Sequence, residues 1–152
     1  MTHFPLPEPM KRALALAEAA SEAGEVPVGA VITDADGRIV AEAGNAMRVG
    51  NDPTAHAEML AIRRAGEALF SSRLDGHTLW VTLEPCAMCA GAIALARIEK
   101  LVFAAEDSKG GGVLHGARIF SQTTCHHRPE ILSGIGEKEA SLQLRKFFKE
   151  RR

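Results

Sequence analysis

Apolar and polar positions along the chain follow helix-like and strand-like patterns in turn. After an arm with three prolines, which we expect to be extended, residues 10–23 are rich in Ala, Leu, Lys and Glu and predict a helix that ends at Gly24. The apolar run 26–32 predicts a strand, residues 34–37 a turn, and residues 38–43 the returning strand. The first third of the chain therefore predicts a helix followed by a β-hairpin.

Strands and helices alternate in the rest of the chain. Thr54 is a candidate N-cap for one helix, and Pro85 fits the first turn of another. This alternation after a hairpin predicts a three-layer α/β domain with a mixed central sheet, and residues 1–152 are expected to form a single domain. The expected elements are a helix over 55–69, a strand over 78–83, a helix over 86–96, a strand over 101–104, a short strand within 129–135 and a basic amphipathic helix from 137 to the end.

Composition and charge narrow the class of protein. The chain has 152 residues, 46% hydrophobic and 24% charged, which is typical of a globular domain that buries its own core. The net charge of −1 excludes a global positive field, so RNA binding would need a local basic patch. Since the N-terminus has no secretory pattern and no apolar run is long enough to span a bilayer, we expect a cytoplasmic protein without membrane association.

Two short motifs carry the candidate chemistry, and each begins at the expected start of a helix. Cys86 and Cys89 are three residues apart, so they share one face of a helix, and the helix N-terminus favours their thiolate forms. Together with His56 they make two sulfurs and one imidazole, a ligand set that suits one zinc ion. Three protein ligands leave the fourth tetrahedral position for water, as in catalytic zinc sites, where the pKa of that water falls toward ~7.

Glu58 lies two positions beyond His56, about 200° around an ideal helix, and need not compete for the metal. A carboxylate next to an activated water is suited to move a proton from that water to a departing amine. A lone C-x-x-C also occurs as a redox pair or as half of a structural zinc site, and a lone H-x-E usually carries no function. The combination H-x-E…P-C-x-x-C is the known signature of zinc-dependent nucleobase deaminases, and the role given to Glu58 follows that signature.

Further runs resemble the bacterial tRNA-specific adenosine deaminases, members of the cytidine deaminase superfamily. The similarity extends in order from about Glu25 to Phe103 and resumes at the C-terminus. The resemblance implies a cytidine-deaminase-like α-β-α fold and conversion of the wobble adenosine in a tRNA anticodon stem-loop to inosine by a homodimer. The runs are Glu25-Val26-Pro27-Val28-Gly29-Ala30-Val31, Asn45, Asp52-Pro53-Thr54-Ala55-His56-Ala57-Glu58, Val81-Thr82-Leu83-Glu84-Pro85-Cys86-Ala87-Met88-Cys89-Ala90-Gly91-Ala92 and Phe147-Phe148-Lys149-Glu150-Arg151-Arg152.

The resemblance also implies site residues: zinc on His56, Cys86 and Cys89, one ion per subunit, with Glu58 as the proton shuttle. Around the base, Asn45 would hydrogen-bond the target nucleotide, Val28 would form an apolar wall, and the backbone of Leu83 and Glu84 would edge the pocket. From the residues alone, the interpretation of Asn45 as a loop residue at the end of a strand is favoured, and Val28 is a strand core residue.

The C-terminal helix is the local sign of RNA binding. Phe147 and Phe148 lie among Arg and Lys residues, so bases of an RNA loop could stack on the rings while the cations meet phosphates. Both phenylalanines are alternatively core anchors, with the charges solvated at the helix end. The resemblance favours the RNA-binding interpretation of Phe147 and Phe148.

The sequence departs from the family between Asp107 and Pro129, which puts the choice of substrate in doubt. Here the chain has a glycine-rich run at 109–112 and Cys125-His126-His127, which suggests a second metal only if a partner ligand lies elsewhere. Two other functions therefore stay open. One is deamination of a free base such as guanine or cytosine at the same zinc site, which would not need the basic C-terminus. The other is a non-catalytic zinc module that binds RNA, which would not need Glu58.

Overall fold

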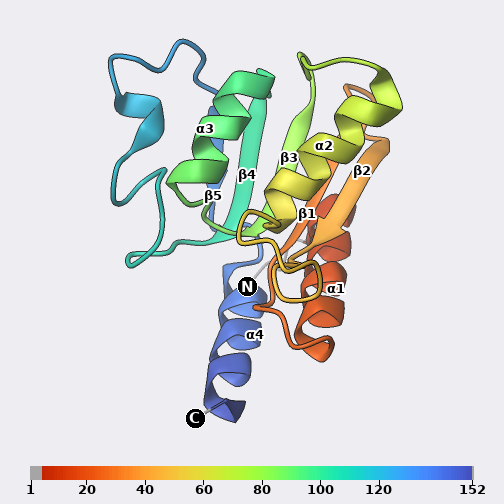
Figure 1. The fold of residues 1–152 in the computed structure, drawn as a ribbon, viewed down its shortest axis with the longest axis vertical. Helices are drawn as coiled ribbons and strands as arrows, with labels where there is room; N and C mark the ends of the chain where they lie inside the picture. Colours follow the sequence, from red (N-terminus) through yellow and green to blue (C-terminus); the bar gives the residue numbers. More distant parts are fainter. Residues whose placement is uncertain (1–4, 152) are drawn as a thin grey trace.

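A mixed β-sheet lies at the centre of the structure, a computed structural model that describes residues 5–151 (Figure 1). β1 runs antiparallel to both β2 and β3, whereas the β3–β4 and β4–β5 pairs are parallel. The mixed sheet expected from the sequence is therefore confirmed. Within the described range the sheet has the order β2-β1-β3-β4-β5, with β1 at Gly29–Thr33, β2 at Ile39–Gly44, β3 at Thr78–Leu83, β4 at Lys100–Ala105 and β5 at Glu130–Ser133.

Helices cover both faces of the sheet and give the expected three layers. α1 (Glu8–Glu22) and α4 (Glu137–Glu150) lie on one face, and α2 (Ala57–Leu69) and α3 (Ala87–Ala96) lie on the other (Figure 1). A 3-10 turn at Ile119–Ser121 packs against α3. Among residues 5–151, the helices are all too short or too polar to span a bilayer.

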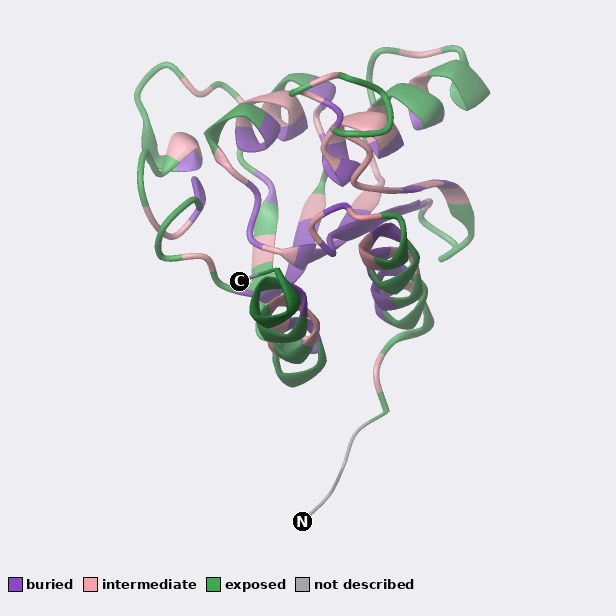
Figure 2. Ribbon diagram, turned by 60° about the horizontal axis from the view of Figure 1, so that its bottom comes forward, coloured by how far each residue is buried: buried purple, intermediate pink, exposed green. Residues whose placement is uncertain are grey.

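Two apolar clusters hold the layers together, because successive strand residues point to opposite faces. Val31 and Val102 join the cluster under α1 and α4, whereas their neighbours Ile32 and Phe103 join the cluster under α2 and α3. Figure 2 shows buried residues along the strands and on the inner sides of the helices, with exposed residues on the outer sides. α1 lies so close to β1 that a Cβ at Gly29 would collide with the carbonyl oxygen of Ala13.

The starts of α1 and β1 differ from the sequence prediction. α1 begins at Glu8, so the extended arm does not reach Met10, and residues 1–4 lie outside the described range. Proline is tolerated there because the first turn of a helix does not use its backbone N–H groups, and Pro9 stands in that turn. β1 begins at Gly29, three residues later than expected, because Val28 N–H turns back to donate to the Val26 carbonyl at 2.8 Å.

α2 begins at Ala57, and Thr54 is not its N-cap, so that prediction is wrong. The Thr54 hydroxyl instead donates to Asp52 Oδ1 at 2.7 Å, which closes a local turn before the helix. The N-cap residue is His56, and the first helical N–H, from Ala57, donates to Asn45 Oδ1 at 2.8 Å. Likewise, α3 begins at Ala87 with Cys86 as its N-cap, so Pro85 precedes the helix.

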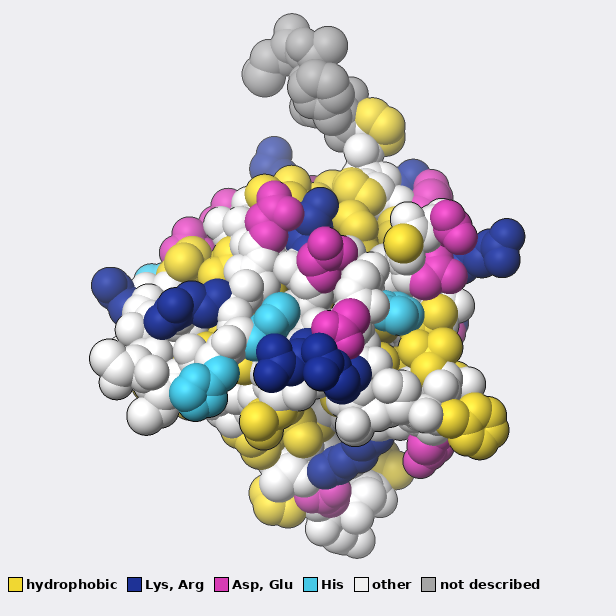
Figure 3. Space-filling view, turned by 90° about the horizontal axis from the view of Figure 1, so that it is seen from above, with side chains coloured by type: hydrophobic (Ala, Val, Ile, Leu, Met, Phe, Trp, Pro, Cys, Tyr) yellow, Lys and Arg dark blue, Asp and Glu magenta, His cyan; other side chains and the backbone are white. Residues whose placement is uncertain are grey.

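Charges of both signs cover the top of the molecule as Figure 1 draws it. Figure 3 shows Lys and Arg side chains near the centre of this face, with His and acidic side chains beside them. The α2–β3 connection and the start of β4 lie at this end, and they carry the ion pairs Arg73–Asp75 (3.0 Å) and Lys100–Glu130 (3.8 Å). Because the two charges within each pair neutralise one another, this end of the molecule is a weak candidate for binding a polyanion.

Candidate metal centre and active site

The starts of α2 and α3 lie side by side, and each helix contributes its N-cap residue to one cluster (Figure 1). His56 caps α2 and Cys86 caps α3, both with extended backbone, while Cys89 is the third residue of α3. The positive dipole ends of both helices therefore point at the same place. This arrangement favours thiolate ligands and a negatively charged or polar reactant.

The distances within the cluster fit a tetrahedral zinc ion. His56 Nδ1 lies 3.6 Å from Cys86 Sγ and 3.5 Å from Cys89 Sγ. All three ligand atoms lie within 4.8 Å of one another. Zinc bonds of about 2.0–2.1 Å to nitrogen and about 2.3 Å to sulfur, at a tetrahedral angle, place N and S about 3.6 Å apart. The structure thus brings together the three ligands that the sequence motifs predict, at the spacing zinc requires.

The pKa values of the two thiols shift in opposite directions. Hydrogen bonding from the Cys89 thiol, and then from His56, lowers the pKa of Cys86 to about 4. The same hydrogen bond, together with burial, raises the pKa of Cys89. Cys86 is therefore a thiolate at neutral pH, and metal binding would release the proton that Cys89 still holds.

Glu58 is the second residue of α2 and is only 4% exposed. Burial raises the pKa of its carboxyl group to about 7, and the nearby His56 charge offsets part of that effect. A buried group with a pKa near neutrality both accepts and donates protons with little cost. Its position next to the three candidate ligands is therefore suited to proton transfer.

Two of the expected base-binding residues lie side by side, Val28 just before β1 and Asn45 just after β2. The Asn45 N–H donates to the carbonyl of Val28 at 3.0 Å, and Asn45 Oδ1 accepts from Ala57 N–H at 2.8 Å. Because Oδ1 is engaged with α2, the amide would meet a nucleotide through its Nδ2–H donors. Val28 is 5% exposed and belongs to the core under α2 and α3.

A buried carboxylate that the sequence analysis did not single out holds the segment before α2. Glu25 is 2% exposed, and its Oε2 accepts hydrogen bonds from Arg48 N–H at 3.0 Å and from Val49 N–H at 2.9 Å. It thus fixes the loop that runs from β2 toward α2. Glu25 is the first residue of the Glu-Val-Pro-Val-Gly-Ala run, and this position was the only sequence signal for it. The sequence analysis gave the Glu25 side chain no role.

Leu83 and Glu84, expected to edge the pocket, follow one another at the end of β3 but face different surroundings. Leu83 lines a surface hollow of about 930 Å³ together with Val26, loop residues 106–110 and the α4 side chains Leu144 and Phe148, with Arg151 just beyond the helix. The Glu84 side chain is buried and bonds to the loop 107–115. The sequence pointed only to the backbone of Glu84 and missed the role of its side chain.

The two C-terminal phenylalanines occupy different environments. Phe147 is 5% exposed and packs edge-to-face against Phe148, with a ring centroid separation of 5.3 Å. The Arg151 guanidinium carbon lies 3.9 Å from the Phe147 ring centroid and covers it. Phe148 is 52% exposed and lines the hollow. The structure therefore favours the core-anchor interpretation for Phe147 and leaves Phe148 available for stacking.

The Cys125-His126-His127 segment does not converge on a second metal site within residues 5–151. The Cys125 thiol donates to the His127 carbonyl at 3.2 Å, and His127 Nε2 lies 2.7 Å from the carbonyl oxygen of Ile98. These contacts tie the segment to the end of α3, so they support a structural role.

Comparison with known proteins places the whole chain among deaminases. The family model for MafB19-like deaminases matches residues 7–152. The tRNA-specific adenosine deaminase of Agrobacterium fabrum strain C58 is 53% identical over 99% of this chain and 95% of its own. A solved structure from a study of A-to-I editing by tRNA:A34 deaminases at the wobble position of transfer RNA has a TM-score of 0.88 and 53% identity, covering 90% of this chain and 98% of that one.

A solved guanine deaminase from Bacillus subtilis is a shorter match. It is 46% identical over 70% of this chain and 66% of that one, with a TM-score of 0.63. The more complete match in both length and shape is therefore with the tRNA deaminases.

Proposed function

Because this chain belongs to the MafB19-like deaminase family and to its tRNA-specific adenosine deaminases, we propose that it hydrolyses the wobble adenosine of a tRNA anticodon loop to inosine. The single observation that carries this function is the cluster of His56, Cys86 and Cys89 beside the buried Glu58, at distances that suit zinc. The match along nearly the whole chain to tRNA-acting relatives favours RNA over a free base.

In this proposal His56, Cys86 and Cys89 hold one zinc ion per subunit. When bound, the ion supplies the positive charge that lowers the pKa of a water molecule toward ~7. Glu58 would accept a proton from the water molecule that adds to C6 of adenine and pass it to N1. It would then move the remaining hydroxyl proton to the exocyclic nitrogen, so that the C6–N bond breaks, ammonia leaves and C6 keeps the oxygen as a carbonyl. Burial raises the pKa of the Glu58 carboxyl group above its usual value, which makes it a better proton acceptor.

Base recognition falls to residues at the edge of the cluster. Asn45 donates from Nδ2 to the target nucleotide, and Val28 with the backbone at Leu83 and Glu84 bounds the base. Since Asn45 also caps α2, the group that reads the nucleotide is fixed to the helix that carries His56 and Glu58.

The anticodon stem-loop binds along the end of α4 and the adjoining hollow. Phe148 presents its exposed ring to a loop base, and the exposed side chains Arg145, Lys146 and Lys149 meet phosphates. Lys109 lines the hollow on the opposite wall and adds a further cation. A chain with a net charge of −1 needs such a local patch to attract RNA.

We also propose that residues 1–152 act as one deaminase domain within a homodimer, in the cytoplasm where tRNA is found. α3 is apolar around its whole circumference, and such a helix is expected to be buried. Its outer side chains Met88 and Leu95 are 37% and 84% exposed, and Phe70 after α2 is 97% exposed. A dimer through this face would cover them. Light scattering should give twice the 16.2 kDa chain mass, and Leu95→Glu should shift the protein toward monomer.

The deciding experiment offers the zinc-loaded protein an anticodon stem-loop with a wobble adenosine and, in parallel, free bases and nucleosides. Inosine in the stem-loop alone supports the proposed function. Ammonia from a free base with an untouched stem-loop would move the enzyme to small-molecule metabolism. No ammonia from any substrate would support a non-catalytic zinc module instead.

The metal assignment has its own test. Cys86→Ala should abolish stoichiometric zinc, since two remaining ligands bind the ion weakly. Metal analysis of the purified variant checks this, and an unchanged zinc content would contradict the proposed ligands. Cys125→Ala is the matched control and should keep one zinc ion per chain, because Cys125 bonds only to the backbone of its own segment among the described residues.

A further inference from the structure

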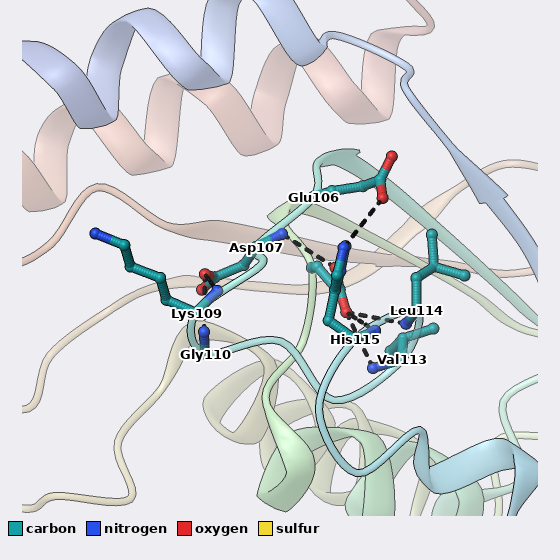
Figure 4. A network of polar contacts seen from close by, with 8 residues as sticks. Glu106, Asp107, Lys109, Gly110, Val113, Leu114 and His115 are labelled. Carbon is teal, nitrogen blue, oxygen red and sulfur yellow. Dashed lines mark hydrogen bonds and ion pairs between the residues drawn. The ribbon is translucent and has the colours of Figure 1, made fainter.

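A second polar cluster, whose side chains have no part in the chemistry described above, lies next to the metal-binding segment. Its members are Glu84, His115 and Glu106, which also have ligand atoms within 4.8 Å of one another. His115 Nδ1 lies 2.8 Å from Glu84 Oε1, and His115 Nε2 lies 3.7 Å from Glu106 Oε1 (Figure 4). The three groups form a chain from a buried carboxylate to an exposed one.

The Glu84 carboxylate is saturated with hydrogen bonds from one loop. Its Oε1 accepts from Asp107 N–H at 3.0 Å as well as from His115, and the side chain has no exposed area. Oε2 accepts the backbone N–H groups of Val113 (3.1 Å), Leu114 (2.9 Å) and His115 (3.2 Å). A metal at this cluster would have to displace these donors and leave them unpaired in a buried place, so the geometry excludes that use.

The loop held by Glu84 lies directly on the start of α3. Gly112 N–H donates to the carbonyl of Pro85 at 2.8 Å, one residue before the candidate ligand Cys86. A Cβ at Gly112 would come within 2.5 Å of the backbone nitrogen of Ala87, and a Cβ at Gly111 would collide with the Glu84 carboxylate. Loop and metal-binding segment are therefore packed without space for a side chain between them.

The other end of the chain reaches the hollow beside α4. Glu106, Asp107 and Lys109 line that hollow opposite Phe148. Figure 4 shows His115 between Glu106 and the loop residues Val113 and Leu114, while Lys109 extends away from the cluster. Asp107 also fixes its own turn, because its Oδ1 accepts from Lys109 N–H at 3.1 Å and from Gly110 N–H at 2.9 Å.

We propose that Glu84 and His115 are positioning residues that hold loop 106–110 as a preformed wall of the RNA-binding hollow. Glu84 anchors the loop to the segment that carries the metal ligands, and His115, which bonds to Glu84 Oε1, lies 3.7 Å from Glu106 at the rim. The inference rests on the proposed function, since it gives the hollow an RNA strand as its ligand. A preformed wall lowers the entropy lost on binding, so the network acts on affinity for the stem-loop and leaves the chemical step alone.

The central test compares His115→Leu with His115→Asn, because His115 is partly exposed and its replacement leaves the core intact. The Asn side chain can present an N–H donor near the place of Nδ1, so it retains the bond to Glu84 that Leu removes. We expect His115→Leu to raise KM and Kd for the anticodon stem-loop about tenfold, the loss of one hydrogen bond to a charged group. The kcat should stay within about threefold with zinc unchanged, and His115→Asn should recover most of the affinity.

Glu84→Gln is the second variant and should raise KM further, with faster hydrogen exchange at the amides of residues 107 and 113–115. His77→Leu is the matched control at the opposite end of β3 and should leave KM and Kd for the stem-loop unchanged. An unchanged KM in His115→Leu, a fall in kcat alone, or equal effects of Leu and Asn would overturn the positioning role. A wild-type enzyme that leaves the stem-loop untouched would instead overturn the proposed function, and with it an RNA ligand for the hollow.

Discussion

Gly112→Ala tests whether the glycine-rich loop must lie against the start of α3. The added Cβ would lie 2.5 Å from Ala87 N, 2.7 Å from Ala87 Cα and 2.8 Å from the carbonyl carbon of Cys86. The nearest of these falls about 0.9 Å short of the 3.4 Å at which ordinary contact begins, and every obstructing atom belongs to the backbone. The loop must therefore move away from α3 by about that distance.

This movement also strains the hydrogen bonds that Gly112 makes on both sides. Its N–H donates to Pro85 and its carbonyl accepts from Ile119 N–H, each at 2.8 Å. We expect a loss of about 1–3 kcal/mol in the free energy of unfolding, as for other overpacked sites. For a chain of this size, that loss lowers the melting temperature by about 2–12 °C. Urea unfolding and calorimetry of the zinc-loaded protein measure both values.

Gly91→Ala is the matched control when both variants are made in the monomeric Leu95→Glu background, because it adds the same methyl group within α3 on the face proposed for the dimer. A Cβ at Gly91 meets nothing within 4 Å, and alanine has the higher helix propensity, so stability should rise by about 0.5–1 kcal/mol. If Gly112→Ala proved as stable as the wild type, the loop would be free to leave α3, and the steric reasoning would be refuted. The same result would weaken the argument that Glu84 holds a fixed wall.

Three further predictions concern chemistry, RNA binding and acid stability. Glu58→Ala should keep zinc but lower inosine formation about 10²–10⁴-fold, and full residual activity would end its assignment as proton shuttle. Phe148→Ala should weaken stem-loop binding and lower stability only by about 0.5–1.5 kcal/mol, the loss of its edge-to-face contact with Phe147. Phe147→Ala should destabilise the fold by about 3–5 kcal/mol, and the reverse pattern would contradict their separation by burial. The hydrogen bond from Arg12 holds the pKa of Glu42 below its usual 4.5, so this pair stabilises the fold above that pH and ceases to do so as the pH falls through the lowered pKa. Arg12→Gln should therefore lower the melting temperature at pH 7 but hardly at about pH 2, and an equal loss at both would show that the pair acts through packing.

The candidate ligands were predictable from sequence because their geometry is mostly local. The three-residue spacing at a helix start was enough to predict that Cys86 and Cys89 share one metal. A second helix start in an alternating α/β pattern was enough to add His56. The elements themselves followed from periodicity and glycine or proline positions. Errors fell at the starts of elements, such as Thr54 before α2, where the side chain of Asn45, just after β2, supplied the bond that a local cap was expected to make.

The anchoring carboxylates could not be predicted in this way. Glu84 and its loop donors are 23–31 residues apart in sequence, and the Glu25 carboxylate reaches donors 23–24 residues away. Parallel strand pairing between β3 and β4 brings the first pair of segments together, and no local pattern encodes that register. The glycines at 110–112 were visible, but only the structure shows that close packing against α3, with no positive φ at these positions, requires the small residue at Gly112.

Phe147 and Phe148 show why an amphipathic pattern could not separate an anchor from a binding residue. Neighbouring helical positions differ by about 100°, so the hydrophobic pattern of α4 permits either ring to face the core. The choice depends on how α4 rests against β4 and α1, which buries Phe147 and turns Phe148 to the hollow. Arg151 then covers the Phe147 ring and also lines the hollow. A buried anchor and an exposed ring on consecutive residues give the Phe148 side chain a rigid base, which would reduce the entropy lost if a nucleotide stacks on it as proposed.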